Sequence, residues 1–188
     1  MSTSITGILR EIGSDQPGVQ VETLEPVTLL AMEIAREGRR GQSIGTMFVV
    51  SDEANVLEHS KCLILDPLIH HPDEEKHITN PNMWETLKEL AQLDGAFIVS
   101  EHGIVISAAR YIDATARNID LPLGLGSRHM AAASITLVTD AVAVVVSESS
   151  IVRIFDEGKI VAEIIPELYL LKQYGLHTEN LYTHRSDE

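Results

Sequence analysis

The stretch AVAVVVSES, residues 141–149, begins with six consecutive apolar residues. Such a run, without alternating polar positions, is typical of a strand that is buried on both faces, inside a sheet that helices cover on two sides. A hairpin pattern follows directly, with its turn at residues 156–159 between the segments IVRIF and IVAEI. We therefore expect this part of the chain to contribute strands to one central sheet.

Helix-like and strand-like patterns alternate upstream of this strand. In residues 24–37, apolar side chains recur at spacings of three and four, with Pro26 suited to the first turn of a helix and Gly38 to its end. The expected helices cover 24–37, 81–93, 127–140 and 166–175, and the expected strands cover 45–50, 60–68, 94–100, 104–112, 141–149, 151–155 and 160–164. In the third helix Ser127 is expected to be the N-cap.

This order of elements indicates a single α/β domain with a central mixed β-sheet flanked by helices. A length of 188 residues and a hydrophobic share of 44% suit one domain with its own core. We expect that domain at residues 24–165, preceded by an N-terminal extension at 1–23. A C-terminal helix and a polar tail are expected at 166–188.

Composition also limits the partners of the protein. The formal net charge is −14 at pH 7, which repels phosphate backbones and argues against nucleic-acid binding. No apolar run approaches the roughly 18–20 residues that cross a bilayer, and the first residues lack the order of a signal peptide. We expect a cytoplasmic protein without a membrane partner. The basic cluster Arg36, Arg39 and Arg40 is interpreted as a charged helix end.

The first candidate for chemistry is LDGAFIVS, where a carboxylate and two small residues stand between a helix and a buried strand. Gly95 and Ala96 would let a ligand approach the backbone closely. Asp94 could hold a divalent metal or accept a proton. An Asp-Gly pair is also common in plain turns, and that interpretation stays open on these residues alone.

The second candidate is GLGSRHMAAAS, in which glycines lead into the start of a helix. Free backbone N–H groups, the positive end of the helix dipole and the guanidinium of Arg128 would together form an anion site suited to phosphate. Ser127 could contact a phosphate oxygen, and His129 lies beside it. The alternative is an ordinary capped helix with a surface arginine and histidine.

Together, the two candidates resemble the paired DGA and RHR signatures of the diadenylate cyclase domain family. They stand here as Asp94-Gly95-Ala96 and, about thirty residues later, as Arg128-His129-Met130. The flanks EIAREGRRGQSIGTMFVVSD, WETLKELAQLDGAFIVS, AARYI and VTDAVAVVVSES are similar to that family in order and spacing. The similarity runs from about residue 24 to about residue 164.

The resemblance implies an enzyme that condenses two ATP molecules into cyclic di-AMP and two pyrophosphates, in a face-to-face dimer of ATP-loaded subunits. Asp94, Arg128 and His129 would be its catalytic residues. Asp94 and Glu148 would bind a divalent metal ion, which could be Mn²⁺, Mg²⁺ or Co²⁺. The implied ATP-binding residues are Gly95, Ala96, Ile112, Ser127, Arg128, His129, Ser147 and Glu148.

Three positions depart from the family pattern. Met130 replaces the second arginine of RHR, Ser127 replaces a threonine, and Ser149 replaces the second glutamate of a Ser-Glu-Glu stretch. The losses at 130 and 149 favour an alternative, a catalytically weak or inactive module that binds ATP to regulate assembly. A purely structural α/β domain is a further alternative, and it would make both signatures coincidental.

The loop IHHPDEEKH, residues 69–77, carries histidines and acids but no spacing typical of a zinc site. We interpret it as a solvated loop. The lone Cys62 allows no internal disulfide and suits a thiol in the core or at a sheet edge.

Overall fold

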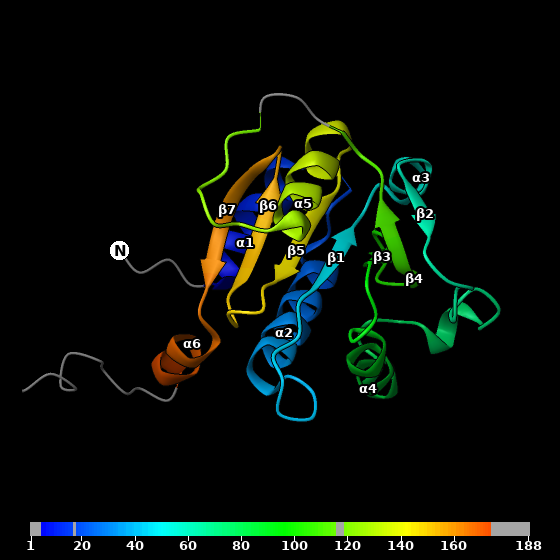
Figure 1. Ribbon diagram of the computed structural model, residues 1–188, viewed down its shortest axis with the longest axis horizontal. Helices are drawn as coiled ribbons and strands as arrows, with labels where there is room; N and C mark the ends of the chain where they lie inside the picture. The colour runs from blue at the N-terminus through cyan, green and yellow to red at the C-terminus, as the bar shows by residue number, and fades with distance from the viewer. Residues whose placement is uncertain (1–4, 17, 116–118, 174–188) are drawn as a thin grey trace, which may run out of the picture.

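A seven-stranded sheet runs through the protein in the order β2-β4-β3-β1-β5-β6-β7 (Figure 1). This computed structural model describes residues 5–16, 18–115 and 119–173. The strands are β1 (Thr46–Val50), β2 (Ser60–Cys62), β3 (Ala96–Val99), β4 (Val105–Ile112), β5 (Val142–Val146), β6 (Val152–Asp156) and β7 (Lys159–Ile164). Strands β1 and β3 are parallel, and the other neighbouring pairs are antiparallel. The expected mixed sheet is therefore confirmed.

Helices cover both faces of the sheet (Figure 1). They are α1 (Ile5–Asp15), α2 (Val21–Glu37), α3 (Glu53–Glu58), α4 (Pro81–Leu90), α5 (Ser127–Val138) and α6 (Pro166–Gln173), with a short 3-10 helix at Asp73–Glu75. Helices α1, α2 and α4 contribute to the core on one face. Helices α3 and α5 contribute to a second core on the other face. The expected α/β domain with flanking helices is thus present.

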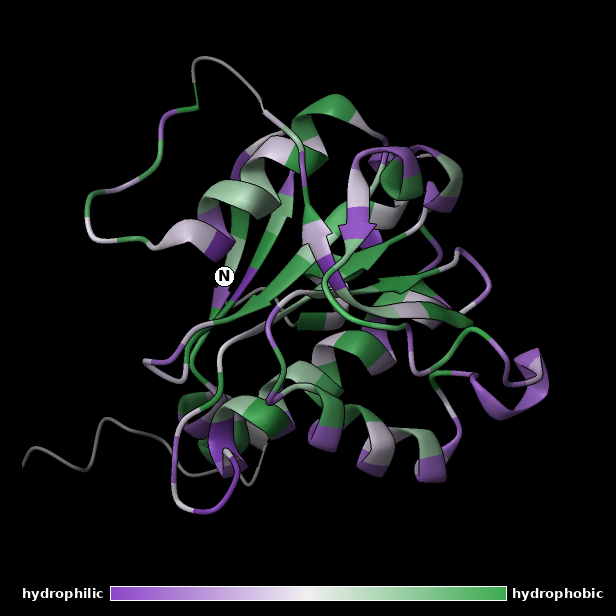
Figure 2. Ribbon diagram, turned by 45° about the vertical axis from the view of Figure 1, so that its right-hand side comes forward, coloured by the Kyte–Doolittle hydropathy of each residue, from purple (hydrophilic) through white to green (hydrophobic). Residues whose placement is uncertain are grey.

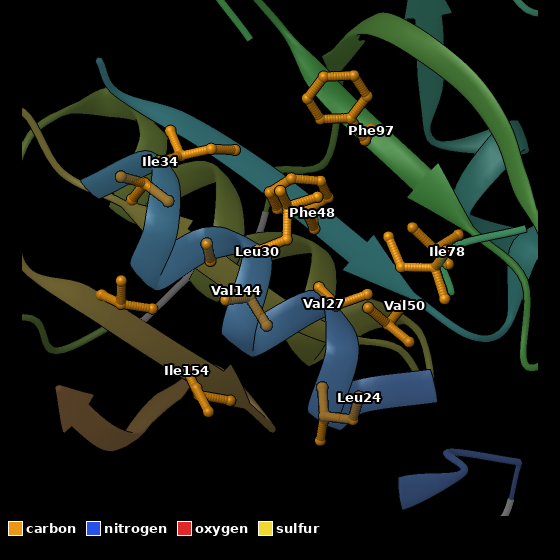
Figure 3. Packing of buried hydrophobic residues seen from close by; sticks show 14 of the residues in the cluster. Leu24, Val27, Leu30, Ile34, Phe48, Val50, Ile78, Phe97, Val144 and Ile154 are labelled. Carbon is orange, nitrogen blue, oxygen red and sulfur yellow. The ribbon is translucent and has the colours of Figure 1, made fainter. Parts of the chain in front are cut away.

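Successive side chains of β1 point to opposite faces of the sheet and so belong alternately to the two cores. Phe48 and Val50 face α2, whereas Met47 and Val49 face α5. The rings of Phe48 and Phe97 stack with centroids 4.9 Å apart, which joins β1 to β3 on the α2 face (Figure 3). All five residues of β5 are buried, as its apolar sequence predicts.

Helix α2 buries one apolar stripe against the sheet. Gly38 is its C-cap, as predicted, and the N–H of Gly38 donates to the carbonyl of Ile34. Figure 3 shows Leu24, Val27, Leu30 and Ile34 of the helix in the same hydrophobic cluster as Phe48, Val144 and Ile154 of the strands. Hydrophobic residues follow the strands in Figure 2, and hydrophilic residues gather on the outer parts of helices and on loops. In the described part of the chain, no helix is both long and apolar enough to cross a membrane.

The N-terminal part of the chain differs from expectation. Helix α1 lies within residues 1–23, where no element was predicted, and its Leu9 and Ile12 belong to the same core as α2. Helix α2 begins at Val21, so that Pro26 lies inside the helix and not in its first turn. The short helix α3 after β1 was not predicted, and its N-cap Asp52 has a left-handed backbone conformation.

Other boundaries are also corrected. Ser127 is the first residue of α5, and Gly126 is the N-cap, without a side-chain cap hydrogen bond. The predicted strand at 60–68 is limited to β2, which pairs with β4 at the sheet edge. Cys62 lies exposed on this edge strand. The polar tail predicted after the helix at 166–175 lies outside the described residues.

Adjacent leucines in α2 provide a test of this core. Leu30 is fully buried, whereas Leu29 is 38% exposed. We expect Leu30→Ala to lower the free energy of unfolding by about 2–5 kcal/mol, because it leaves a cavity under the sheet. Leu29→Ala should cost less than about 1 kcal/mol. Urea unfolding of both variants measures the difference, and equal losses would contradict this arrangement.

Candidate active site

Three chain segments meet at one end of the central strands because of the directions in which these strands run. Strand β3 runs parallel to β1, so Ala96 at its start lies opposite Met47 near the start of β1. Strand β5 runs antiparallel, so Val146 at its end lies opposite Thr46. The residues before β3 and those after β5 therefore emerge side by side, and the N-terminus of α5 lies over them.

Two cavities adjoin the N-terminus of α5. The larger one, about 540 Å³, lies between the loop before α5 and the segment after β5. Its lining comprises Leu123, Gly124, Leu125, Gly126, Ser127, Arg128, His129, Val146, Ser147, Glu148, Ser149 and Arg153. The smaller one, about 410 Å³, is lined by Met47, Leu63, Asp94, Gly95, Arg110, Tyr111, Ile112, Ser127, Arg128 and Ala131. Ser127 and Arg128 belong to both linings and form the shared wall.

The guanidinium of Arg128 lies between two carboxylates. Its Nη2 is 3.6 Å from Oδ1 of Asp94, and its Nη1 is 3.5 Å from Oε1 of Glu148. Both acids are largely exposed, at 91% and 73% of their side chains. The two acids predicted as metal ligands thus flank one cation at the shared wall.

His129 points the other way, into the protein. It is 6% exposed, and its ring lies 6.1 Å from that of Phe155. Its Nε2 is 3.3 Å from Nη1 of Arg153. Arginine has no acceptor atoms, so Nε2 accepts this hydrogen bond and the neutral ring carries its proton on Nδ1. That Nδ1 is buried and has no hydrogen-bond partner among the described residues.

Burial lowers the pKa of His129, and the nearby positive charges of Arg153 and Arg128 lower it further. Desolvation and like charge both disfavour the protonated ring. The ring is therefore neutral near pH 7 in this arrangement. The cationic side chains at this end of the larger cavity are Arg128 and Arg153.

Ser147 is engaged in the turn that follows β5. Its hydroxyl donates to the carbonyl of Ile151 at 3.1 Å, accepts from the N–H of Ile151 at 3.2 Å and lies 2.7 Å from the hydroxyl of Ser149. Ser149, where the family pattern has a glutamate, thus stabilises the turn instead of adding a carboxylate. This turn holds Glu148 outward at the cavity.

The remaining predicted residues lie around the smaller cavity, with one exception. Gly95 has a φ of +105°, and a Cβ there would lie 2.7 Å from the backbone of Ala109 and Arg110. Glycine is therefore required for β4 to approach so closely. Ile112, at the end of β4, contributes an apolar wall. Ala96 is buried in the sheet and lines neither cavity.

Gly45 and Arg153 are among the residues of the site that sequence reasoning missed. Gly45 precedes β1, and a Cβ there would lie 2.5 Å from Nη1 of Arg128. Arg153 lies on β6 and lines the larger cavity. The signal for Arg153 was a single cation in the apolar run IVRIF, next to the strand that carries Ser147 and Glu148.

The other candidates do not form a site. In the loop at 69–77, His71 lies 3.7 Å from Glu75, and Lys76 pairs with Asp73 at 2.9 Å. No group of three or more histidines, cysteines or acids placed to hold a metal occurs in residues 5–16, 18–115 and 119–173. Arg39, in the basic cluster, pairs with Glu85 and Glu89.

Comparisons with known proteins match this α/β domain, in which the sheet lies between two layers of helices. The family model described as "DisA bacterial checkpoint controller nucleotide-binding" matches residues 33–160. The chain belongs to this family, as the resemblance predicted.

Two curated relatives, both named diadenylate cyclase, are similar to most of the chain. That of Methanocaldococcus jannaschii is 47% identical over 153 residues, 81% of this chain and 48% of the relative. That of Haloferax volcanii is 40% identical over 156 residues, 81% of this chain and 55% of the relative. The chain thus spans about half the length of these relatives.

Solved structures share the fold. A hypothetical membrane spanning protein from Bacillus cereus has a TM-score of 0.59 and 21% identity, over 82% of this chain and 68% of that chain. DacA from Staphylococcus aureus, as a double mutant, has a TM-score of 0.50 and 23% identity, over 83% and 97%. These structures support the α/β fold described above.

The lowered pKa of His129 predicts a pH dependence of stability. As the pH falls below the ordinary histidine value of 6.5, the unfolded chain gains a proton that folded His129 takes up only at lower pH. The contribution of His129 to stability should therefore fall from about pH 6.5 downward, through its folded pKa. Urea unfolding between about pH 8 and about pH 5 should show a smaller loss in His129→Gln. An NMR titration placing the pKa of His129 at or above 6.5 would contradict this.

Proposed function

We propose that this chain is a diadenylate cyclase, which joins two ATP molecules into cyclic di-AMP and releases two pyrophosphates. The observation that carries the proposal is the pair of cavities sharing Ser127 and Arg128 at the N-terminus of α5. Membership of the family and the names of the two relatives agree with it. We assign the cyclase domain to residues 24–165, with α1 packed on it.

The two cavities suit the two ends of a nucleotide. The smaller one has apolar walls from Met47, Leu63, Ile112 and the ring of Tyr111, which suit a purine base, with Asp94 and Gly95 at the ribose. The larger one has the helix N-terminus, Arg128 and polar groups after β5, which suit phosphates. The α-phosphate would then lie at the shared wall.

Asp94 and Glu148 would hold the divalent metal ion. They present two hard oxygen donors at one guanidinium, and they are exposed enough to reach a bound nucleotide. Magnesium sites typically use one or two carboxylates, completed by substrate phosphates and water. The donors present therefore fit Mg²⁺ or Mn²⁺, and equally Co²⁺. Bound there, the ion would favour deprotonation of the ribose hydroxyl and offset phosphate charge.

The reaction needs positioning more than covalent catalysis. Each 3′-hydroxyl loses its proton to solvent and attacks the α-phosphorus of the opposing ATP, and the bond from that phosphorus to the bridging oxygen breaks, so that pyrophosphate leaves with that oxygen. Two such displacements close the ring and release two pyrophosphates. Asp94 would orient the hydroxyl, and Arg128 and the α5 N–H groups would stabilise the charge that develops on the phosphates. His129, neutral and buried, would support the helix start from below.

The product contains two adenylates, and the described residues of one chain provide one pair of cavities. A second copy must therefore bring the second ATP. The cavity linings include large apolar side chains that are open to solvent: Leu123 is 102% exposed, Tyr111 is 48% exposed, and Leu63 is 46% exposed. Burial of these side chains in a face-to-face dimer would contribute to its stability.

A second function has a specific observation in its favour. Ser149 bonds to Ser147 where the family pattern has an acid, so the site lacks that carboxylate. A module that binds ATP without turnover would explain this loss and that of the arginine at 130. It would use the same cavities.

One assay separates these functions. The purified protein is incubated with ATP and each divalent metal in turn, and the nucleotides are separated by chromatography. Cyclic di-AMP formed together with pyrophosphate supports the cyclase. Bound but unconverted ATP with every metal supports the binding module.

The role of Asp94 predicts a sharp loss of activity. Asp94→Asn should lower the rate of cyclic di-AMP formation by about 10²-fold or more, because it removes a metal ligand and the group that orients the hydroxyl. Stability should be unchanged, since the side chain is exposed. Glu74→Gln, which removes one exposed charge far from the site, is the matched control. Full activity of Asp94→Asn would overturn the assigned role.

The dimer predicts a dependence on protein concentration. The rate per subunit should rise with concentration until the dimer is saturated, because a monomer brings only one ATP. The measurement compares specific activity with the dimer fraction from analytical ultracentrifugation. Specific activity that stays constant far below the dimer dissociation constant would exclude the dimer requirement.

A further inference from the structure

We propose that Arg153 binds the terminal phosphates of the nucleoside triphosphate and supplies the positive charge that position 130 lacks. This assignment rests on the proposed function of the two cavities. It concerns a residue outside both signatures, on a different element of the fold.

Arg153 is held in place by its neighbours on the sheet. In the register it lies opposite Val145 of β5 and opposite Glu163 of β7. Its Nε lies 2.7 Å from Oε2 of Glu163, and its side chain is only 12% exposed. Its Nη1 is directed toward Nε2 of His129 at 3.3 Å. The guanidinium is therefore ordered before any ligand binds, which lowers the entropy cost of binding.

The position of Arg153 identifies which phosphates it would meet. Arg128 lines both cavities, whereas Arg153 lines only the larger one. Asp94 and Gly95 line only the smaller one, at the ribose end. A nucleotide whose α-phosphate lies at the shared wall must therefore extend its outer phosphates toward Arg153.

Binding of the outer phosphates requires a cation in addition to Arg128. Arg128 already lies between the carboxylates of Asp94 and Glu148, and the second of these lines the larger cavity. Met130 is 46% exposed and lines neither cavity. Arg153 has one partner carboxylate, Glu163, which is 50% exposed and so well screened by solvent. Its guanidinium can thus bind a second, more highly charged anion.

The test measures binding of three ligands, two that carry the outer phosphates and one that lacks them. Calorimetric titration with inorganic tripolyphosphate, ATP and AMP is carried out on the full chain and on Arg153→Gln. We expect about tenfold or greater weakening for tripolyphosphate and ATP, and less than about twofold for AMP, since a charged hydrogen bond is lost only at the outer phosphates. Arg39→Gln, which removes another arginine paired with glutamates, should change none of the affinities.

Glu163→Gln distinguishes a phosphate contact of Arg153 from a purely structural role of its ion pair with Glu163. It removes the negative charge but leaves an amide oxygen that can accept the hydrogen bond from Nε of Arg153 and keep the guanidinium ordered, so tripolyphosphate should bind as tightly as before or more tightly. A loss equal to that of Arg153→Gln would show that the ion pair matters and the phosphate contact does not. An equal loss of AMP and ATP affinity in Arg153→Gln, or no loss at all, would also overturn the proposal.

These outcomes are distinct from failure of the proposed function. A wild-type chain that binds ATP without forming cyclic di-AMP would refute the cyclase, and the binding comparison at Arg153 would still decide this proposal. If Arg153→Gln keeps both its affinities and its rate of product formation, only the role of Arg153 fails.

Discussion

Everything at the site depends on the burial of β1 and β5 on both faces. Every residue of both strands is buried and all but Thr46 are apolar, so each strand lies inside the sheet with helices on both faces. Strand β3 runs parallel to β1, and β5 runs antiparallel to both. The starts of β1 and β3 and the end of β5 therefore lie at the same end of the sheet. Only there can Asp94, Glu148 and the start of α5 meet. The hydrophobic core therefore determines where charge can be placed.

The sequence was sufficient to predict the central elements because their patterns are local. The apolar stripe of α2 and the continuous run of β5 each report burial without knowledge of their partners. Helix α1 was missed although Ile5, Ile8, Leu9 and Ile12 have helical spacing, because its stability depends on packing against the rest of the core. The start of α2 was misplaced because Pro26 is an ordinary start signal that tertiary contacts here override.

The sequence motifs of the site could be predicted, but the hydrogen bonds between its side chains could not. Asp94 and Arg128 stand in recognisable patterns, and the structure brings them within 3.6 Å. The contact of Arg153 with His129 depends on sheet register and helix position, which no local pattern encodes. The hydroxyl of Ser147 looked available in the sequence, yet the backbone of its own turn engages it. Such competition between ligand and backbone becomes visible only once the chain is folded.

Gly45 has a consequence for how this protein could be tuned. Its missing side chain makes the space in which the guanidinium of Arg128 rests, against the backbone just before β1. A single methyl group at this position would push the guanidinium away from the sheet without altering any charge. Residue 45 therefore acts as a spacer, and its size sets how far the wall between the two cavities projects. Through this residue, shape alone could adjust the electrostatics of the pocket.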